Sequence, residues 1–213
     1  GSMALFGDGA SIARSIKTTR SRWRNAWDWG LFIGGAVPAL VFGIAFGNLL
    51  LGLPFHYDRD LQVYYTGSFI ALLNPFGLLA GVVSLAMLTM HGASYLQLRT
   101  EGEINARAGR ALRISALIVI AAFALAGIWI ATGIDGYRIV SMPAADSAFT
   151  PLAKTVERVP AGWLANYSAH PWTLIAPVLG FAGALLAILW SRGSRAIAAF
   201  LATAVSVSCI ILT

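Results

Sequence analysis

The chain has 213 residues, of which 58% are hydrophobic and 11% charged, and its formal net charge is +6. Charged residues are about half as frequent as in soluble globular domains, and a chain of this composition folded in water would expose much apolar surface. The composition excludes a disordered tail and an ordinary soluble enzyme, and it indicates a membrane protein. The single cysteine, Cys209, excludes an internal disulfide and a metal site built on several cysteines.

The N-terminal residues are expected to lie outside the membrane. Gly1–Met3 resembles a remnant of cloning, and the rest of residues 1–27 forms a basic arm. Asp28 follows at the expected membrane edge, where a carboxylate near the positive end of a helix would be stabilised and would pair with Arg24. The functional alternative is that Asp28, together with Trp27 and Arg24, forms the mouth of a proton route or a subunit interface.

Five runs free of charged residues follow, each long enough for one membrane span. They predict an all-α, polytopic membrane helix bundle over residues 28–213, with five transmembrane helices near residues 29–50, 75–96, 114–134, 172–190 and 196–212. Asn74-Pro75 and His170-Pro171 supply suitable helix starts. Pro38 and Pro177 fall inside spans and predict kinks. Close helix contacts are predicted at three glycine pairs, Gly30/Gly34, Gly43/Gly47 and Gly77/Gly81.

The lysines and arginines outside these spans predict the orientation. Eleven fall on the side of the N-terminal arm, in that arm and in the connections near residues 99–113 and 192–195, and four fall on the other side. The positive-inside rule therefore places the N-terminus in the cytoplasm and residues 135–171 in an outward-facing loop, expected to form an ordered cap. Because topology explains the basic excess, no nucleic-acid partner is predicted. The apolar end at Thr213 leads us to expect an internal segment of a longer protein.

The three histidines do not predict a haem site within this chain. Two histidines that hold one haem must lie at matching depth on facing helices, whereas His91 lies in the second span and His56 and His170 lie in outward connections. We expect His91 to be hydrogen-bonded within the bundle, the alternative being a proton-path or cofactor role. A segment of a secondary transporter is the second functional hypothesis, although no ionisable residue lies beside Pro38 or Pro177.

Several longer strings carry a family resemblance. In order and spacing they resemble subunit II of the bacterial cytochrome bd quinol oxidases, from about Arg20 to Thr213. The strings are Arg22–Gly30 (RWRNAWDWG), Phe46–Phe55 (FGNLLLGLPF), Leu72–Gly81 (LLNPFGLLAG), Gly92–Thr100 (GASYLQLRT), Phe123–Trp129 (FALAGIW) and Gly133–Tyr137 (GIDGY).

The resemblance implies a multi-pass protein of the bacterial inner membrane, part of a complex that oxidises quinol and reduces oxygen to water. It implies that haems b558, b595 and d lie in a partner, subunit I, and that this chain holds none of them. Membrane lipid and a structural quinone are further implied partners. Relatives of full length have three spans before the Arg22–Gly30 motif and one after Thr213, so this chain alone is expected to be inactive.

Overall fold

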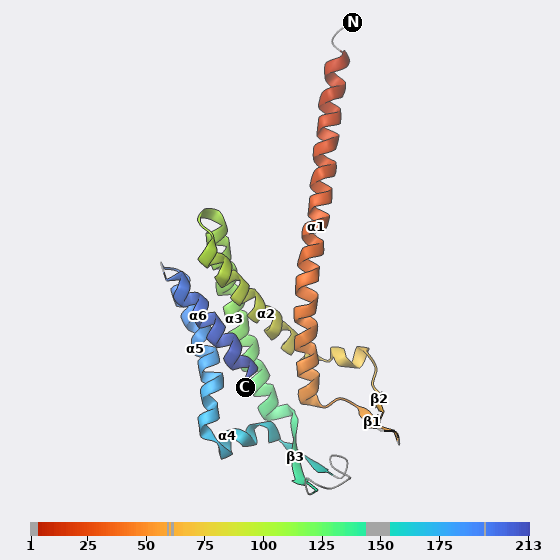
Figure 1. Cartoon of the computed structure of the whole chain (residues 1–213), viewed down its shortest axis with the longest axis vertical. Helices are drawn as coiled ribbons and strands as arrows, with labels where there is room; N and C mark the ends of the chain where they lie inside the picture. The colour runs from red at the N-terminus through yellow and green to blue at the C-terminus, as the bar shows by residue number, and fades with distance from the viewer. Residues whose placement is uncertain (1–3, 59, 61, 144–153, 194) are drawn as a thin grey trace. The chain divides into compact units, whose positions relative to one another are not determined.

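The computed structural model describes residues 4–58, 60, 62–143, 154–193 and 195–213, and of residues 4–22 the backbone alone (Figure 1). The chain consists of two compact units, Gly1–Ala39 and Leu40–Thr213. Its α-helices are α1 (Ala4–Leu51), α2 (Pro75–Arg99), α3 (Gly102–Gly133), α4 (Ala165–Ala169), α5 (Ile175–Trp190) and α6 (Ala196–Ile211). Short 3₁₀ helices are η1 (Ile70–Leu73), η2 (Gly162–Leu164) and η3 (Pro171–Leu174).

Within the described residues, four helical segments are long and apolar enough to cross a membrane. They are Trp23–Leu51, Pro75–Arg99, Gly102–Gly133 and Pro171–Trp190, and the apolar helix α6 is shorter at 16 residues. The predicted all-α polytopic bundle is thereby confirmed, whereas the fifth predicted span, α6, stays a prediction because its 16 residues fall short of the length of the other four.

Two helices begin earlier than the predicted spans. Helix α1 begins at Ala4 and α3 at Gly102, so Arg107 and Arg113, which were expected in a connection, lie on α3. The absence of charge marks where a helix enters lipid and not where the helix begins. Arginine, alanine and glutamate are good helix formers outside the membrane as well.

Helices α2, α3, α5 and α6 form the bundle of the second unit (Figure 1). Helix α2 packs on α3 and α6, and α5 packs on α6 and α3. The buried core around Met90 and Leu112 consists mainly of alanines, namely Ala93, Ala116, Ala184, Ala187 and Ala202. Large apolar side chains such as Leu117 and Leu189 point outward. Small residues inside and large ones outside are typical of helices that pack within lipid.

Two of the three predicted glycine pairs bring helices together. A Cβ atom at Gly47 would lie 2.9 Å from the Cβ of Ala80 and 3.0 Å from the Cα of Gly77, and one at Gly43 would lie 2.6 Å from the Cα of Gly81. The pairs Gly43/Gly47 and Gly77/Gly81 therefore face each other across α1 and α2. The first pair, Gly30/Gly34, borders open space.

The helix start predicted at Asn74-Pro75 is confirmed, whereas at His170-Pro171 the proline lies in the first turn but the His170 side chain forms no cap. The side chain of Asn74 accepts a hydrogen bond of 2.7 Å from the backbone N–H of Gly77, and Pro75 is the first residue of α2. His170 and Pro171 begin η3, which continues directly into α5. Pro177 consequently lies in the first turn of α5, where a missing N–H costs little. Only Pro38 lies deep inside a helix among the prolines of α1 and α5.

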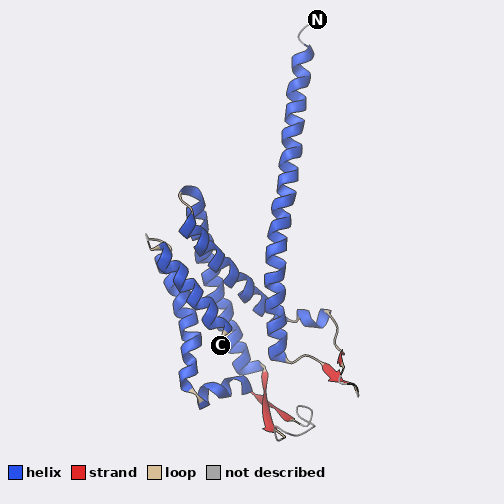
Figure 2. Ribbon diagram, viewed as in Figure 1, coloured by secondary structure: helices blue, strands red, loops and turns tan. Residues whose placement is uncertain are grey.

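Two small antiparallel hairpins, absent from the prediction, lie in the connections (Figure 2). Strand β1 (Phe55–Tyr57) pairs with β2 (Val63–Tyr65), and β3 (Asp135–Ser141) pairs with β4 (Thr155–Pro160) through a bulge at Ile139–Ser141. The second hairpin, η2 and α4 make up the described part of the loop predicted over residues 135–171. Residues 144–153 of that loop lie outside the described residues.

The second hairpin and η2 contact the end of α1. The hydroxyl of Tyr137 donates to the carbonyl of Leu51 (3.3 Å), and the indole N–H of Trp163 donates to the carbonyl of Leu50 (3.2 Å). These are carbonyls of the last helical turn, which have no partner within the helix. Arg158 lies 5.5 Å above the ring of Tyr137 and supports it by a cation–π contact. In α4, burial raises the pKa of Tyr167.

Candidate functional site

His91 lies at the centre of a polar cluster between α2 and α6. Its Nδ1 atom lies 3.0 Å from the hydroxyl of Thr203, and the hydroxyl of Ser94 lies 2.9 Å from the same oxygen. Thr203 and Ser94 are fully buried, whereas His91 is half-buried. The imidazole also stacks on Phe200, with ring centroids 4.9 Å apart and planes 27° apart. The expectation that His91 is hydrogen-bonded within the bundle is confirmed.

The two hydroxyl protons of the cluster have two sets of acceptors. In one arrangement Thr203 donates to the carbonyl of Phe200 (2.7 Å) and Ser94 to the carbonyl of His91 (2.6 Å), so that His91 must donate from Nδ1. In the other, Ser94 donates to Thr203 and Thr203 donates to Nδ1, which places the proton of a neutral ring on Nε2. The geometry therefore satisfies both neutral tautomers of His91 by rotation of two hydroxyl groups.

Asp28, Arg24 and Trp27 lie on α1 in the first unit, and all three side chains are exposed. Asp28 lies well inside a helix that begins at Ala4, so the expected stabilisation by the helix N-terminus is wrong: the partial charge decays within the first turn. Among the described residues, no ion pair joins Arg24 to Asp28. Trp27 instead contacts Trp23 edge to face, with ring centroids 5.9 Å apart.

A buried pair of asparagines joins the end of α1 to the start of α2. Asn48, which is 6% exposed, donates from Nδ2 to the carbonyls of Ile44 (2.8 Å) and Leu72 (2.7 Å). Its Oδ1 accepts from Nδ2 of Asn74 at 2.7 Å. The capping role of Asn74 was predictable from its sequence neighbours, whereas Asn48 was not predicted, although a lone asparagine within an apolar run was a usable signal.

Gln97 is another buried polar residue that was not predicted from the sequence. Its Nε2 donates to the carbonyl of Ser191 at 2.7 Å and so ties α2 to the end of α5. Its Oε1 is buried without a hydrogen-bond partner among the described residues. Since Gln97 packs against Gly109 of α3, it marks the point where three helices meet.

The three histidines lie in separate parts of the described structure. The described residues contain no group of three or more His, Cys, Asp or Glu side chains placed to hold a metal ion. The Nδ1 atom of His91 is used by Thr203, and one face of its ring is covered by Phe200. His56 lies in β1, stacked on Tyr64, and His170 begins η3, so neither shares a helix bundle with His91.

Comparisons with known proteins give one consistent result. The family model "Cytochrome bd terminal oxidase subunit II" matches residues 2–213, so the match extends further toward the N-terminus than the resemblance noted from the sequence. "Cytochrome bd-I ubiquinol oxidase subunit 2" of Escherichia coli (strain K12) is 49% identical over 197 residues, which are 92% of this chain and 52% of that protein.

Two further relatives agree. "Probable cytochrome oxidase subunit 2" of Haemophilus influenzae is 44% identical over 99% of this chain and 55% of its own length. "Cytochrome bd ubiquinol oxidase subunit 2" of Bacillus subtilis (strain 168) is 28% identical over 59% of this chain and 36% of its own length. The chain thus spans about half the length of the first two relatives. Since the family model covers nearly all of it, the chain belongs to the cytochrome bd terminal oxidase subunit II family.

Proposed function

We propose that this chain forms part of the non-haem subunit of a quinol oxidase complex in the bacterial inner membrane. The complex oxidises quinol and reduces oxygen to water, and a haem-bearing subunit I is the partner. The observation that supports this most is the family match over residues 2–213, together with 49% identity to a ubiquinol oxidase subunit 2. The spanning helices are consistent with the proposed location.

In this proposal haems b558, b595 and d are bound by subunit I. The use of His91 within its own cluster and the position of His56 and His170 outside the bundle support that assignment. The contribution of this chain is then to support the partner, to line a proton route and to contact membrane lipid and a quinone. No observation favours the transporter alternative, since Pro177 lies in a first helical turn and does not break α5.

His91 is the residue of the bundle best suited to handle a proton. Rotation of the Thr203 and Ser94 hydroxyls lets its Nδ1 atom either donate or accept a hydrogen bond, so the cluster accommodates both neutral tautomers. Asp28, flanked by Arg24 and Trp27, is proposed as a group at the mouth of a proton route, because its carboxylate is exposed on α1.

The haem assignment is tested by expressing the full-length subunit with and without subunit I. We expect the subunit to co-purify with a haem-bearing partner, and to be colourless when it is purified alone. Absorption spectra and haem-to-protein ratios measure both. A stoichiometric haem spectrum from this subunit alone would contradict the proposal, as would assembly of an active, fully haem-loaded oxidase without it.

A further inference from the structure

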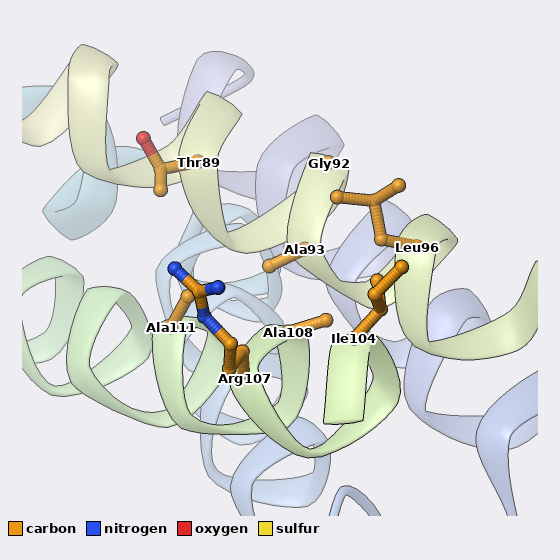
Figure 3. Close-up of a pocket in the computed structure, with 8 residues that line it drawn as sticks. All are labelled: Thr89, Gly92, Ala93, Leu96, Ile104, Arg107, Ala108 and Ala111. Carbon is orange, nitrogen blue, oxygen red and sulfur yellow. The ribbon is translucent and has the colours of Figure 1, made fainter. Parts of the chain in front are cut away.

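A groove between α2 and α3 combines apolar walls with a single cationic group. Its volume is about 530 Å³, and it is lined from α2 by Thr89, Gly92, Ala93 and Leu96 and from α3 by Ile104, Arg107, Ala108 and Ala111. We call it the α2–α3 groove. Figure 3 shows the guanidinium of Arg107 extending from α3 across the groove toward Thr89 of α2. The alanines and the glycine form the narrow floor of the groove, while the exposed side chains of Leu96 and Ile104 form its edges.

The positive charge of Arg107 makes an anion the expected ligand of the groove. Arg107 has no ion-pair partner among the described residues, and no acidic side chain lines the groove. Glu101 is the N-cap residue of α3 and Glu103 lies in its first turn, four residues before Arg107, and the two acids are outnumbered by Arg99, Arg107, Arg110 and Arg113. The hydroxyl of Thr89 donates to the carbonyl of Leu85 at 2.8 Å, which leaves its oxygen free only as an acceptor. Arg107 is therefore the group that binds, and a guanidinium matches a phosphate with two parallel hydrogen bonds.

The apolar lining of the groove favours a hydrocarbon chain over a peptide segment. An extended peptide would bring unpaired backbone groups into an apolar site, which is costly within a membrane. A hydrocarbon chain has no polar groups to leave unpaired, and its contacts would be with Ala93, Leu96 and Ile104.

The position of the groove along α2 and α3 indicates which leaflet of the membrane would supply the ligand. The groove lies where α2 ends and α3 begins, beside the connection that the positive-inside rule places in the cytoplasm. Basic pockets between helices at that level attract anionic lipid headgroups. We propose that the α2–α3 groove binds one anionic phospholipid of the inner leaflet, with its phosphate on Arg107 and an acyl chain along the alanine floor. The site rests only on the membrane location within the proposed function, and it requires no oxidase activity.

The test uses the assembled complex with the full-length subunit, stripped of lipid in steps and weighed by native mass spectrometry. Phosphatidylglycerol is the probe, and phosphatidylcholine is the neutral comparison. We expect Arg107→Gln to lower phosphatidylglycerol retention about fivefold, the effect of one cationic side chain near a lipid headgroup. Arg110→Gln is the matched control, because it removes the same charge one turn later from a residue outside the groove, and we expect it to retain phosphatidylglycerol like the wild type.

A second variant tests the shape of the site. A Cβ atom at Gly92 would meet nothing within 4 Å, so Gly92→Leu fills the groove without a clash and should also lower phosphatidylglycerol retention. Gly127→Leu, at a glycine of α3 that also borders open space, is the control. Where a variant fails to assemble, the wild-type complex with photoactivatable phosphatidylglycerol replaces it. Crosslinks should then map to residues 89–111 and be competed by phosphatidylglycerol and not by phosphatidylcholine.

Four outcomes would overturn the proposal. They are equal lipid retention by the Arg107→Gln and Arg110→Gln complexes, crosslinks mapping elsewhere, a retained molecule that is a quinone or a neutral phospholipid, and a segment of protein found in the groove of the assembled complex. None of these outcomes would affect the assignment of the chain to a quinol oxidase, which the haem and co-purification experiment tests separately.

Discussion

The hydroxyl of Thr203 can form a hydrogen bond with Nδ1 of His91 in either neutral tautomer of the ring. It is the only oxygen within hydrogen-bonding distance of both Ser94 and the His91 ring among the described contacts. The sequence predicts that His91 has a partner within the bundle, since an unpaired imidazole in lipid is costly. It could not predict Thr203, which is 112 residues away, because the pairing depends on how α2 and α6 pack.

The first residue-scale prediction concerns His91→Phe in the assembled complex. The variant keeps an aromatic ring on Phe200 but removes both ring nitrogens, so we expect quinol oxidase turnover to fall by about tenfold or more if the ring carries protons. The pH profile of turnover should also change shape. His56→Phe is the control, since His56 likewise stacks on an aromatic ring, that of Tyr64. Equal turnover and equal pH profiles for the two variants would limit His91 to a packing role.

A second prediction concerns Asp28→Asn. The substitution keeps size and polarity and removes only the charge, so slower proton uptake during turnover is the expected result if Asp28 lies at the mouth of a proton route. A pH-sensitive dye outside reconstituted vesicles measures the uptake. The control is Asp60→Asn, at an exposed residue between β1 and β2. Unchanged turnover and proton uptake would remove Asp28 from the route.

Asn48 carries a third prediction, on stability. Asn48→Leu removes the short bonds to the carbonyl of Leu72 and from the amide of Asn74 and leaves only the longer contacts of Asn74 with Ala71 and Leu72, which we expect to cost about 0.5–1.5 kcal/mol for each bond lost. The measurement is the temperature at which the detergent-solubilised complex loses its folded state. Asn166→Leu, at an exposed asparagine of α4, should leave that temperature nearly unchanged.

At the scale of elements, the glycine pairs show what a sequence motif can and cannot specify. All three pairs have the same spacing, yet only Gly43/Gly47 and Gly77/Gly81 meet a neighbouring helix in the described structure. The spacing shows that one face of a helix carries small residues. Whether the small-residue face of another helix packs against it depends on how all the helices are arranged.

This difference predicts opposite effects of one substitution on one helix. A Cβ atom at Gly43 would collide with the backbone of Ala80 and Gly81, so Gly43→Ala should destabilise the subunit by about 1–3 kcal/mol. At Gly34 the same Cβ atom meets nothing within 4 Å, and Gly34→Ala should stabilise α1 by roughly 0.5–1 kcal/mol. Thermal stability of the purified complex compares the two variants. Destabilisation of similar size at both sites would contradict the close approach of α1 and α2.

Helix starts and strands were predictable to different degrees for physical reasons. The start of α2 was predictable because the side chain of Asn74 caps a backbone N–H only three residues away and Pro75 suits the first helical position. The start of α3 at Gly102 was not, since the charged residues before Ile114 are compatible with both helix and loop. Strands β1 and β2 have 3 residues each, too few for an alternating pattern, and β3 and β4 are exposed along most of their length, so neither has the buried face that produces alternation.

At the scale of the whole molecule, the charge distribution predicts which side each connection faces. In a Cys209→Ser background, a membrane-impermeant thiol reagent applied to intact cells should label Gln62→Cys, between β1 and β2, and should not label Glu101→Cys, between α2 and α3. Both positions are exposed, so a difference in labelling reports topology. Labelling of Glu101→Cys alone would reverse the orientation, together with the leaflet assigned to the α2–α3 groove.

The contacts of Tyr137 and Trp163 with the end of α1 also have a consequence for biosynthesis. The partners are separated by 86 and 113 residues, and ribosomes add about 5–20 residues per second. The carbonyls of Leu50 and Leu51 therefore lack their side-chain donors for on the order of 5 to 20 seconds during synthesis. During that interval only water can satisfy them, so the end of α1 must remain hydrated until the later hairpin has crossed the membrane and folded back.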